Sequence, residues 1–333
     1  MNTLLSLVAV LGLMLLAFLG SMAGLQIVFG SIFPYLALLI FVVGVVYRIV
    51  KWGRAPVPFR IPTTCGQQKS LPWIKTAPLD NPHTTLGVLG RMFLEIFFFR
   101  SLFRNTSTGV HGDDEKVSYG PSPWLWLGGL VFHWSMVMIV MRHTRFFLDQ
   151  VPQGILALQY MDSFMEVGVP AFYASSFMFL AALTFLFLRR IVSPQVRYIS
   201  LVNDYFPLFM LLGIGGTGFT LRHLLKTDIV GVKEVTMGLV TFQPATMEIA
   251  QSLHPLFYIH LFLVCVLLAY LPFSKLMHMG GVFMSPTRNM ANTNREIRHI
   301  NPWNPKVKLH SYEEYEDEFR EKMKKAGIPV DKE

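Results

Sequence analysis

The stretch "HLFLVCVLLAYLPFSKLMH", residues 260–278, begins and ends with histidine and is apolar over most of its length. An α-helix rises about 1.5 Å and turns about 100° per residue, so eighteen steps place His260 and His278 about 27 Å apart on one face of a straight helix. The hydrocarbon core of a bilayer is about 30 Å thick. We therefore expect one membrane-spanning helix with an imidazole near each membrane surface.

The composition of the whole chain is that of a membrane protein. Its 333 residues are 52% hydrophobic and only 15% charged, and a helix needs about 20 mainly apolar residues to cross the bilayer. The first apolar stretch resembles a secretory signal, but it lacks a leading Lys or Arg and is read as an uncleaved helix. The sequence predicts an all-α integral membrane protein, a bundle of about six transmembrane helices, at residues 4–19, 29–50, 124–141, 167–188, 206–221 and 252–275.

Positive charges predict the orientation of the chain. If the amino terminus faces the cytoplasm, six spans leave only five of the 29 Lys and Arg on the outer side: Arg142, Arg145, Arg222, Lys226 and Lys233. Positive charge gathers on the cytoplasmic side of membrane proteins. We therefore expect a multi-pass protein of the inner (cytoplasmic) membrane with both termini in the cytoplasm. The net charge of +8 is then a topology signal, and no motif indicates nucleic-acid binding.

A second pair of histidines lies on the third predicted span. "WLWLGGLVFHWSMVMIVMRH", residues 124–143, places His133 and His143 about 15 Å apart. The third and sixth spans are antiparallel in a six-span bundle, so His133 shares a membrane depth with His278, and His143 with His260. Two imidazoles at each of two depths are what bis-histidine haem b requires. The spacings of about 15 and 27 Å do not match between straight helices, and Pro272 permits a kink.

Two other interpretations of these histidines stay open. A single histidine near a membrane interface is commonly just hydrogen-bonded, and a cofactor-free membrane anchor or transporter also uses buried histidines. Zinc suits the pattern less, because a structural zinc ion needs four neighbouring ligands. The two cysteines, Cys65 and Cys265, exclude an iron–sulfur cluster held by this chain alone, and no motif for covalent c-type haem is present.

These residues resemble a known family. The segment at 260–278, with its Pro-Phe-Ser-Lys run before the last histidine, looks like the final helix of the gamma subunit of respiratory nitrate reductase, and "HWSMVMIVMRH" carries the spacing of that subunit's second helix. The resemblance covers about residues 120–290. It implies two b haems, with the iron ligands at His133, His143, His260 and His278. The lysine that serves the quinone site in that family has no assignable counterpart here.

A more specific resemblance extends along nearly the whole chain. "PFRIPTTCGQQKSLPWIK" (58–75), "RMFLEIFFFRSLFRN" (91–105) and the added first helix look like the DsrM-type cytochrome b of the sulfite-reduction-associated membrane complex. That resemblance implies the menaquinone pool as electron source or sink, and a cytoplasmic iron–sulfur partner similar to heterodisulfide reductase catalytic subunits. It also implies further redox subunits of the same complex.

The chain then divides into four segments: two N-terminal transmembrane helices (1–52), a cytoplasmic loop with an interfacial helix (53–123), a four-helix dihaem cytochrome b domain (124–280) and a cytoplasmic tail (281–333). The interfacial helix is expected at 86–105, where four charges oppose membrane crossing. In the tail, Ser311 and Glu314 form a capping-box pattern that predicts a helix.

We expect an electron-transfer subunit of a quinone-dependent oxidoreductase complex, active in dissimilatory sulfur metabolism, with menaquinol oxidised near the outer haem. Candidates for the quinone or for the haem propionates are the polar residues of the outer side: Arg142, Arg145, Arg222, His223, Glu248 and His254. Arginine suits propionates because it pairs with carboxylates at two points. "GIGGTG" (213–218) fits a nucleotide motif, but it lies in an apolar span and indicates close packing instead. Cys65 has either a structural role or a role at a partner cofactor.

Overall fold

The structure is a computed structural model that describes residues 1–55, 66–111, 116–165, 171–297, 306 and 308–332. Within these residues, five helical segments are long and apolar enough to cross a membrane. They are α1 (Asn2–Met22), Val28–Gly53 with helix α2 (Phe33–Gly53), Pro123–Phe147 with α5 (Pro123–His143), α7 (Ala174–Val192) and Pro255–Phe273 with α12 (Pro255–Tyr270). The prediction of a helical membrane protein is confirmed.

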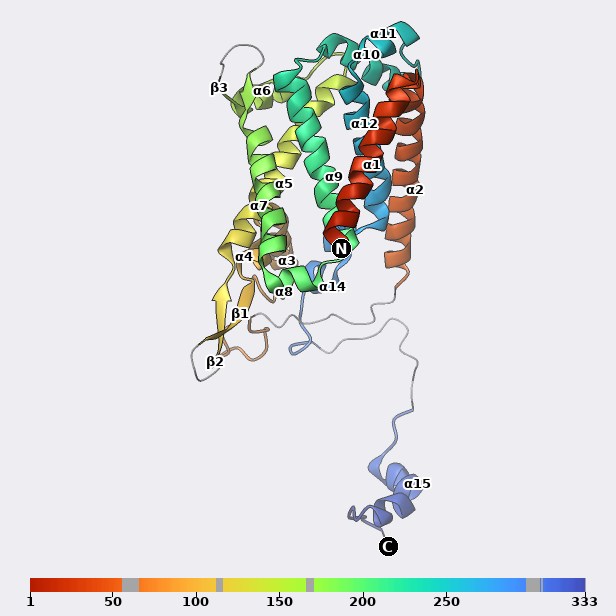
Figure 1. The fold of residues 1–333 in the computed structure, drawn as a ribbon. Coiled ribbons are helices and arrows are strands. Elements are labelled where there is room, and N and C mark those ends of the chain that lie inside the picture. The colour runs from red at the N-terminus through yellow and green to blue at the C-terminus, as the bar shows by residue number, and fades with distance from the viewer. Residues whose placement is uncertain (56–65, 112–115, 166–170, 298–305, 307, 333) are drawn as a thin grey trace.

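The fifth predicted span, 206–221, corresponds to helix α9 (Val202–Phe219), which runs through the same bundle (Figure 1). Helix α9 is not one of the five candidate spans; Asn203 and Asp204 lie in its first turn, and four glycines lie in its second half. It continues into a π-helical turn, η3 (Thr220–Leu224), which carries Arg222 and His223 at its end.

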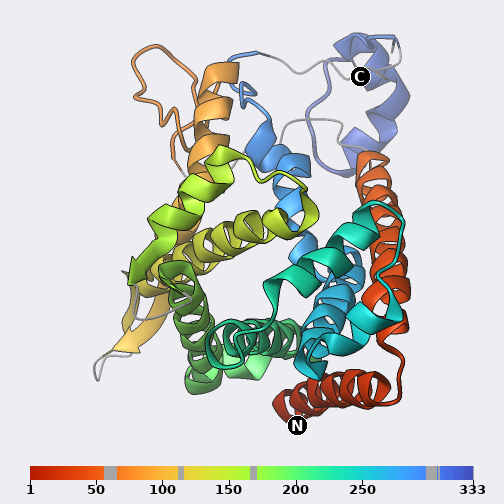
Figure 2. The same ribbon diagram turned by 90° about the horizontal axis from the view of Figure 1, so that it is seen from above.

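The helices are joined in an arc. Helix α5 packs on α7, α7 on α9, and α9 on both α1 and α12, while α12 packs on α2. Helices α5 and α12, which carry three of the four histidines, have at most marginal contact with each other. Figure 2 shows the arc from above. The largest buried cluster lies where α1, α9 and α12 meet, around Met210, Tyr258 and Leu263.

The sixth predicted span is not one straight helix, and the expectation of a single helix from His260 to His278 is wrong. Helix α12 ends at Tyr270, two 3-10 turns follow (η4, Leu271–Phe273, and η5, Lys275–Met277), and His278 begins the next helix, α13 (His278–Met284). Pro272 has no N–H to donate, and Ser274 is extended between the two turns. The break removes the 27 Å spacing that a straight helix imposes.

One end of the bundle carries the helices, strands and loops formed by residues 66–111, 116–121 and 285–297 (Figure 1). The predicted interfacial helix is two helices, α3 (Thr85–Phe98) and α4 (Arg100–Phe103), because Phe99 between them is left-handed, with φ +50°. A hairpin of β1 (Thr106–His111) and β2 (Lys116–Pro121) precedes α5. Helices α8 (Pro194–Ile199) and α14 (Pro286–Asn289) lie at the same end.

Charged side chains fasten α3 and α4 to the neighbouring segments. Asp80 accepts hydrogen bonds from Arg100 (2.5 Å) and Arg104 (2.6 Å), and Glu95 pairs with Arg288 of α14 at 3.0 Å. Burial alone raises the pKa of a carboxyl group, but the hydrogen bonds and charges of the two arginines outweigh it, so that the pKa of Asp80 is lowered. The loop before α3 is therefore held by a carboxylate that stays ionised.

The opposite end carries short elements that the sequence did not indicate: α6 (Gln153–Asp162), the pair β3 (Ser163–Met165) and β4 (Phe172–Tyr173), α10 (Ile229–Val240) and α11 (Met247–Ser252). The span expected from residue 167 begins at Ala174, because Phe172 and Tyr173 are extended and pair with β3. Residues 166–170 lie outside the described residues.

The predicted tail helix is present as α15 (Tyr312–Lys325). Ser311 accepts a hydrogen bond from the backbone N–H of Glu314, and the Glu314 carboxylate accepts one from the N–H of Ser311, both at 3.2 Å. Gly327, two residues after the helix, is left-handed with φ +70°. The capping box and the glycine stop therefore act as predicted.

Candidate functional site

The first histidine pair lies at the end of the bundle that carries α3 and α14. His133 is at the middle of α5 and His278 begins α13, and their ring centroids are 6.0 Å apart with the ring planes at 87°. His133 Nδ1 donates to the Gly129 carbonyl (2.7 Å), and His278 Nδ1 donates to the Lys275 carbonyl (3.0 Å). The ring of Phe99 meets His133 edge-on at 4.9 Å. The break after α12 is what carries His278 to His133.

The second pair joins the far end of α5 to α12. His143 Nδ1 donates to the Ile139 carbonyl at 2.7 Å. His260 Nδ1 lies 2.9 Å from the hydroxyl oxygen of Thr217 on α9. The rings of His143 and His260 are near enough to act on each other electrostatically. The structure thus brings together the same two pairs that the sequence predicted to share a depth.

All four histidines present the same nitrogen. Their Nδ1 atoms are engaged, and within the described residues no hydrogen bond reaches the Nε2 of any of them. For His133, His143 and His278 the partner is a carbonyl oxygen, which can only accept, so Nδ1 carries the proton and Nε2 keeps its lone pair. An imidazole held through Nδ1 is the usual arrangement of a metal ligand. His143 and His278 are also exposed residues, which leaves them open to a bound group.

The donor set fits a haem better than a bare ion. In the part of the chain that the structure describes, no three His, Cys, Asp or Glu side chains gather as a metal site. Two imidazoles suffice when a porphyrin supplies the other four nitrogens. Metal–imidazole bonds are about 2 Å long, which puts the ring centroids of two axial histidines about 6 Å apart. The 6.0 Å between His133 and His278 agrees with that separation.

The glycines of these helices provide close packing. A Cβ on Gly128 would lie 2.7 Å from the Phe185 ring of α7, so this glycine lets α5 approach α7. In "GIGGTG", a Cβ on Gly215 would meet Phe179 at 2.9 Å, and one on Gly218 would lie 3.0 Å from Cε1 of His260. The glycines of the motif therefore let α9 pack closely against α7 and leave room for the His260 ring beside α9.

Arg142 is buried beside His143, and its guanidinium is bound by other side chains of the protein. Its Nε lies 2.9 Å from the Asp162 carboxylate, and its Nη2 donates to the Ser175 hydroxyl at 2.8 Å. Asp162 in turn accepts from the Ser175 N–H (2.8 Å) and hydroxyl (2.7 Å). The guanidinium also stacks on Tyr173, at 3.7 Å from the ring centroid. This network joins the end of α5 to α6, β4 and α7.

Arg222 contacts the same tyrosine ring as Arg142. Its guanidinium lies 4.0 Å from the Tyr173 ring centroid and donates to the Ala171 carbonyl (3.0 Å). Arg145 donates to Gln159 at 2.7 Å. The charges of Arg142, Arg145 and Arg222 all act on the His143 ring. The three arginines expected on the outer side therefore lie near His143 of the second histidine pair.

The remaining candidates lie in different settings. The His223 ring stacks on Phe172 (4.7 Å, 10°), and neither of its buried nitrogens has a hydrogen-bond partner in the described residues. Glu248 is exposed in the first turn of α11. His254 is exposed and caps α12 by accepting from the N–H of Leu256 at 3.1 Å. Cys65 lies outside the described residues.

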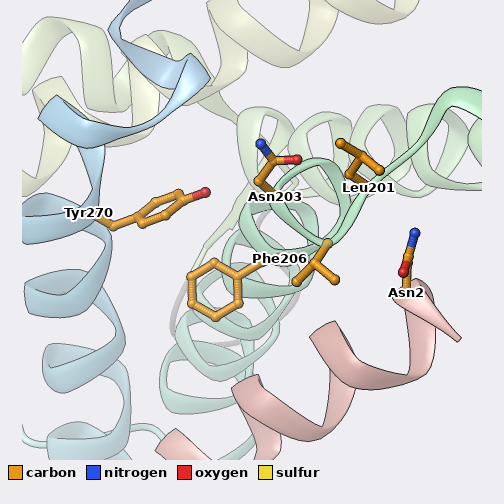
Figure 3. Close-up of a pocket in the computed structure, with 6 residues that line it drawn as sticks. Asn2, Leu201, Asn203, Phe206 and Tyr270 are labelled. Atoms are coloured by element: carbon orange, nitrogen blue, oxygen red, sulfur yellow. The ribbon is translucent and has the colours of Figure 1, made fainter.

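A separate open groove of about 440 Å³ lies where the starts of α1 and α9 meet the end of α12 (Figure 3). None of the predicted site residues lines it; its walls are Asn2, Leu201, Val202, Asn203, Phe206 and Tyr270. Sequence reasoning missed the supporting residues Asp162, Tyr173, Ser175 and Thr217. A buried arginine needs a carboxylate partner, and this rule was the only signal for Asp162.

Known proteins resemble this chain over most of its length. Residues 93–296 match the family described as nitrate reductase gamma subunit. A protein named Hdr-like menaquinol oxidoreductase cytochrome b-like subunit, from Archaeoglobus fulgidus, is 48% identical over 283 residues, 84% of each chain. A protein of the same name from Archaeoglobus profundus is 41% identical over 280 residues, 83% of this chain and 82% of the relative.

The matched region begins within α3 and ends after α14, so it contains both histidine pairs and four of the six helices of the arc, α5, α7, α9 and α12. The relatives extend the similarity over more than four fifths of the chain. With its histidine-bearing helices, its membrane spans and this extent of similarity, the chain belongs to the nitrate reductase gamma subunit family.

Proposed function

We propose that this chain is a membrane dihaem cytochrome b subunit that exchanges electrons between the menaquinone pool and a cytoplasmic iron–sulfur partner. One haem b is held by His133 and His278 and the other by His143 and His260. When bound, the haems supply one-electron redox chemistry at two depths of the bilayer. The observation that carries the proposal is the His133–His278 separation of 6.0 Å, with Nδ1 of both rings held by carbonyl oxygens.

The protein's own contribution is orientation. Each Nδ1 contact fixes the tautomer and limits rotation of the ring, so that Nε2 meets the iron with its lone pair. Apolar side chains of α5, α7 and α9, including Phe132, Phe179 and Leu211, pack beside the histidine-bearing stretch of α5. Such surroundings exclude water from a porphyrin.

Menaquinol is the proposed electron donor, at the outer pair. The printed names of both Archaeoglobus relatives contain menaquinol oxidoreductase, which supports this choice. Arg222 and Arg145 supply positive charge beside His143 for haem propionates. His223 is the candidate for the quinone head group, because an imidazole without a protein partner can accept a hydroquinone proton. Arg142 is a structural support, since Asp162 and Ser175 occupy its guanidinium.

We place the protein in the inner (cytoplasmic) membrane with both termini in the cytoplasm, on the ground of its Lys and Arg distribution. The inner pair then faces the cytoplasmic partner, for which an iron–sulfur subunit like that of heterodisulfide reductase is proposed. The Hdr-like element of the relatives' names and the resemblance to DsrM-type cytochromes support this partner. The same resemblance supports a role in dissimilatory sulfur metabolism, together with further redox subunits.

Haem content of the purified chain tests the proposal. Expressed with ample haem, the wild type should contain two b haems in a reduced-minus-oxidised spectrum and a haem-to-protein assay. His143→Ala should lose one haem and keep the other, while His310→Gln, a change at an exposed histidine of the tail, should keep both. A colourless wild type that inserts normally into membranes would instead favour the cofactor-free anchor or transporter.

A further inference from the structure

Thr217 stands out among the groups that hold the four histidines. Its hydroxyl oxygen lies 2.9 Å from His260 Nδ1, 2.7 Å from the Gly213 carbonyl and 3.1 Å from the Ile214 carbonyl. A hydroxyl has one proton, and the carbonyls, which only accept, take it. With Nε2 of His260 as the proposed iron ligand, Nδ1 carries the proton of the ring, so His260 Nδ1 is the donor and the Thr217 oxygen is the acceptor.

The other three histidines donate to a carbonyl of their own local backbone, three or four residues earlier. His260 is instead held from another helix, by the Thr217 side chain 43 residues away in sequence and by the backbone of Ile214 beside it. Thr217 is only 6% exposed, and its branched side chain has few rotamers available in a helix. Gly218 beside it leaves room for the His260 ring, since a Cβ there would be 3.0 Å from Cε1.

We propose that Thr217 is the positioning residue of the outer haem: its hydroxyl fixes the tautomer and ring plane of His260 and thereby lowers the midpoint potential of that haem. The inference rests on the proposed function, because it takes His260 as an iron ligand. A hydrogen bond accepted from the far nitrogen makes an imidazole a more basic ligand. A more basic ligand favours ferric over ferrous iron, so loss of the acceptor shifts the potential upward.

The test compares two substitutions in the haem-loaded chain. Thr217→Val keeps the shape of the side chain and removes the hydroxyl, whereas Thr217→Ser keeps the hydroxyl. Loss of a hydrogen-bond partner of a metal ligand typically lowers metal affinity 10- to 100-fold. A tenfold change in the preference for ferric over ferrous iron corresponds to about 59 mV in a one-electron couple. Redox potentiometry should therefore show one haem about 59 mV higher in Thr217→Val, with the other haem unchanged.

A second readout reports the ring plane. The low-spin ferric EPR signal of one haem should move or broaden in Thr217→Val, because the His260 ring is no longer held, and it should stay near the wild type in Thr217→Ser. If Thr217→Val does not accumulate, Thr217→Ala removes the same hydroxyl in a residue that helices accept readily. Loss of one haem with retention of the other in either variant also supports the inference.

Unchanged potentials and EPR signals in a haem-replete variant without the hydroxyl would overturn the inference, as would equal shifts in Thr217→Val and Thr217→Ser. His260→Ala separates this failure from failure of the proposed function. If His260→Ala lacks one haem while Thr217→Val is unchanged, only the role of Thr217 is refuted. If His260→Ala keeps both haems, the ligand assignment itself is refuted, and the inference with it.

Discussion

Asp162→Asn should destabilise the end of the bundle that carries His143 by about 3–5 kcal/mol, the cost of leaving one member of a buried ion pair alone. Asp162 and Arg142 are 5% and 8% exposed and 2.9 Å apart. Asparagine keeps the shape and can still accept from the Ser175 N–H, so the change removes mainly the negative charge. Arg142 would then face Arg222 across Tyr173 without its compensating carboxylate.

The assay is denaturant unfolding in detergent, followed by helix content and by the haem spectrum. Because Arg142 precedes His143, the haem proposed for His143 and His260 should be released before the haem proposed for His133 and His278. Lys69→Gln provides the matched control: it breaks the Lys69–Glu296 pair, 3.1 Å long with both side chains about one third exposed. A pair so exposed contributes about 0–1 kcal/mol.

A double variant isolates the charge. Arg142→Met combined with Asp162→Asn removes both charges, and replacement of a buried ion pair by uncharged groups is often neutral. The double variant should therefore recover most of the stability that Asp162→Asn loses. A loss below about 1 kcal/mol in Asp162→Asn, or a double variant less stable than the single one, would refute the reasoning that this pair is a buried electrostatic support.

Three further predictions concern packing, pH and capping. Gly128→Ala should cost about 1–3 kcal/mol in unfolding assays through overpacking against Phe185, and Gly129→Ala less, because its new Cβ would meet only the tip of a leucine at 3.3 Å. Because the pKa of Asp80 is lowered in the folded protein, its carboxylate contributes its full stabilisation above the ordinary pKa of 3.8. This stabilisation is lost as the pH falls through the pKa that Asp80 has in the folded protein. Hydrogen exchange in residues 66–82 should therefore stay slow at about pH 5 and rise only in stronger acid, whereas Asp80→Asn should exchange fast at neutral pH; equal rates in both proteins would contradict this. Ser311→Ala should destabilise α15 by about 1 kcal/mol, seen as faster exchange of its first turn, and unchanged exchange would mean that the cap contributes nothing.

The membrane helices could be predicted because the bilayer imposes a minimum length and an apolar composition on each of them. The grouping of the four histidines into two pairs followed from the antiparallel order of the third and sixth spans, although their spacings did not match in straight helices. The path of the chain after α12 could not be predicted in the same way. Pro272 indicated a kink, but the extended Ser274 and the two 3-10 turns depend on contacts with neighbouring helices, which local sequence does not specify.

The residues that hold the four histidines in place were harder to predict from the sequence than the histidines themselves. Thr217 meets His260 only because α9 packs on α12, and a threonine in a glycine-rich span looks like ordinary packing in sequence. Asp162 ends a short helix that composition does not single out, although it neutralises Arg142. The left-handed Phe99, which splits the expected interfacial helix and places its ring on His133, had no glycine or asparagine to indicate it.

The most direct test of the paired-histidine account is the haem-to-protein ratio in two double variants. His133→Ala with His278→Ala removes both ligands of one site, so this variant should keep one haem, the same haem that either single variant keeps. His133→Ala with His143→Ala removes a ligand from each site and should keep none. One haem in the second variant, or none in the first, would show that these four histidines are not paired as the structure arranges them.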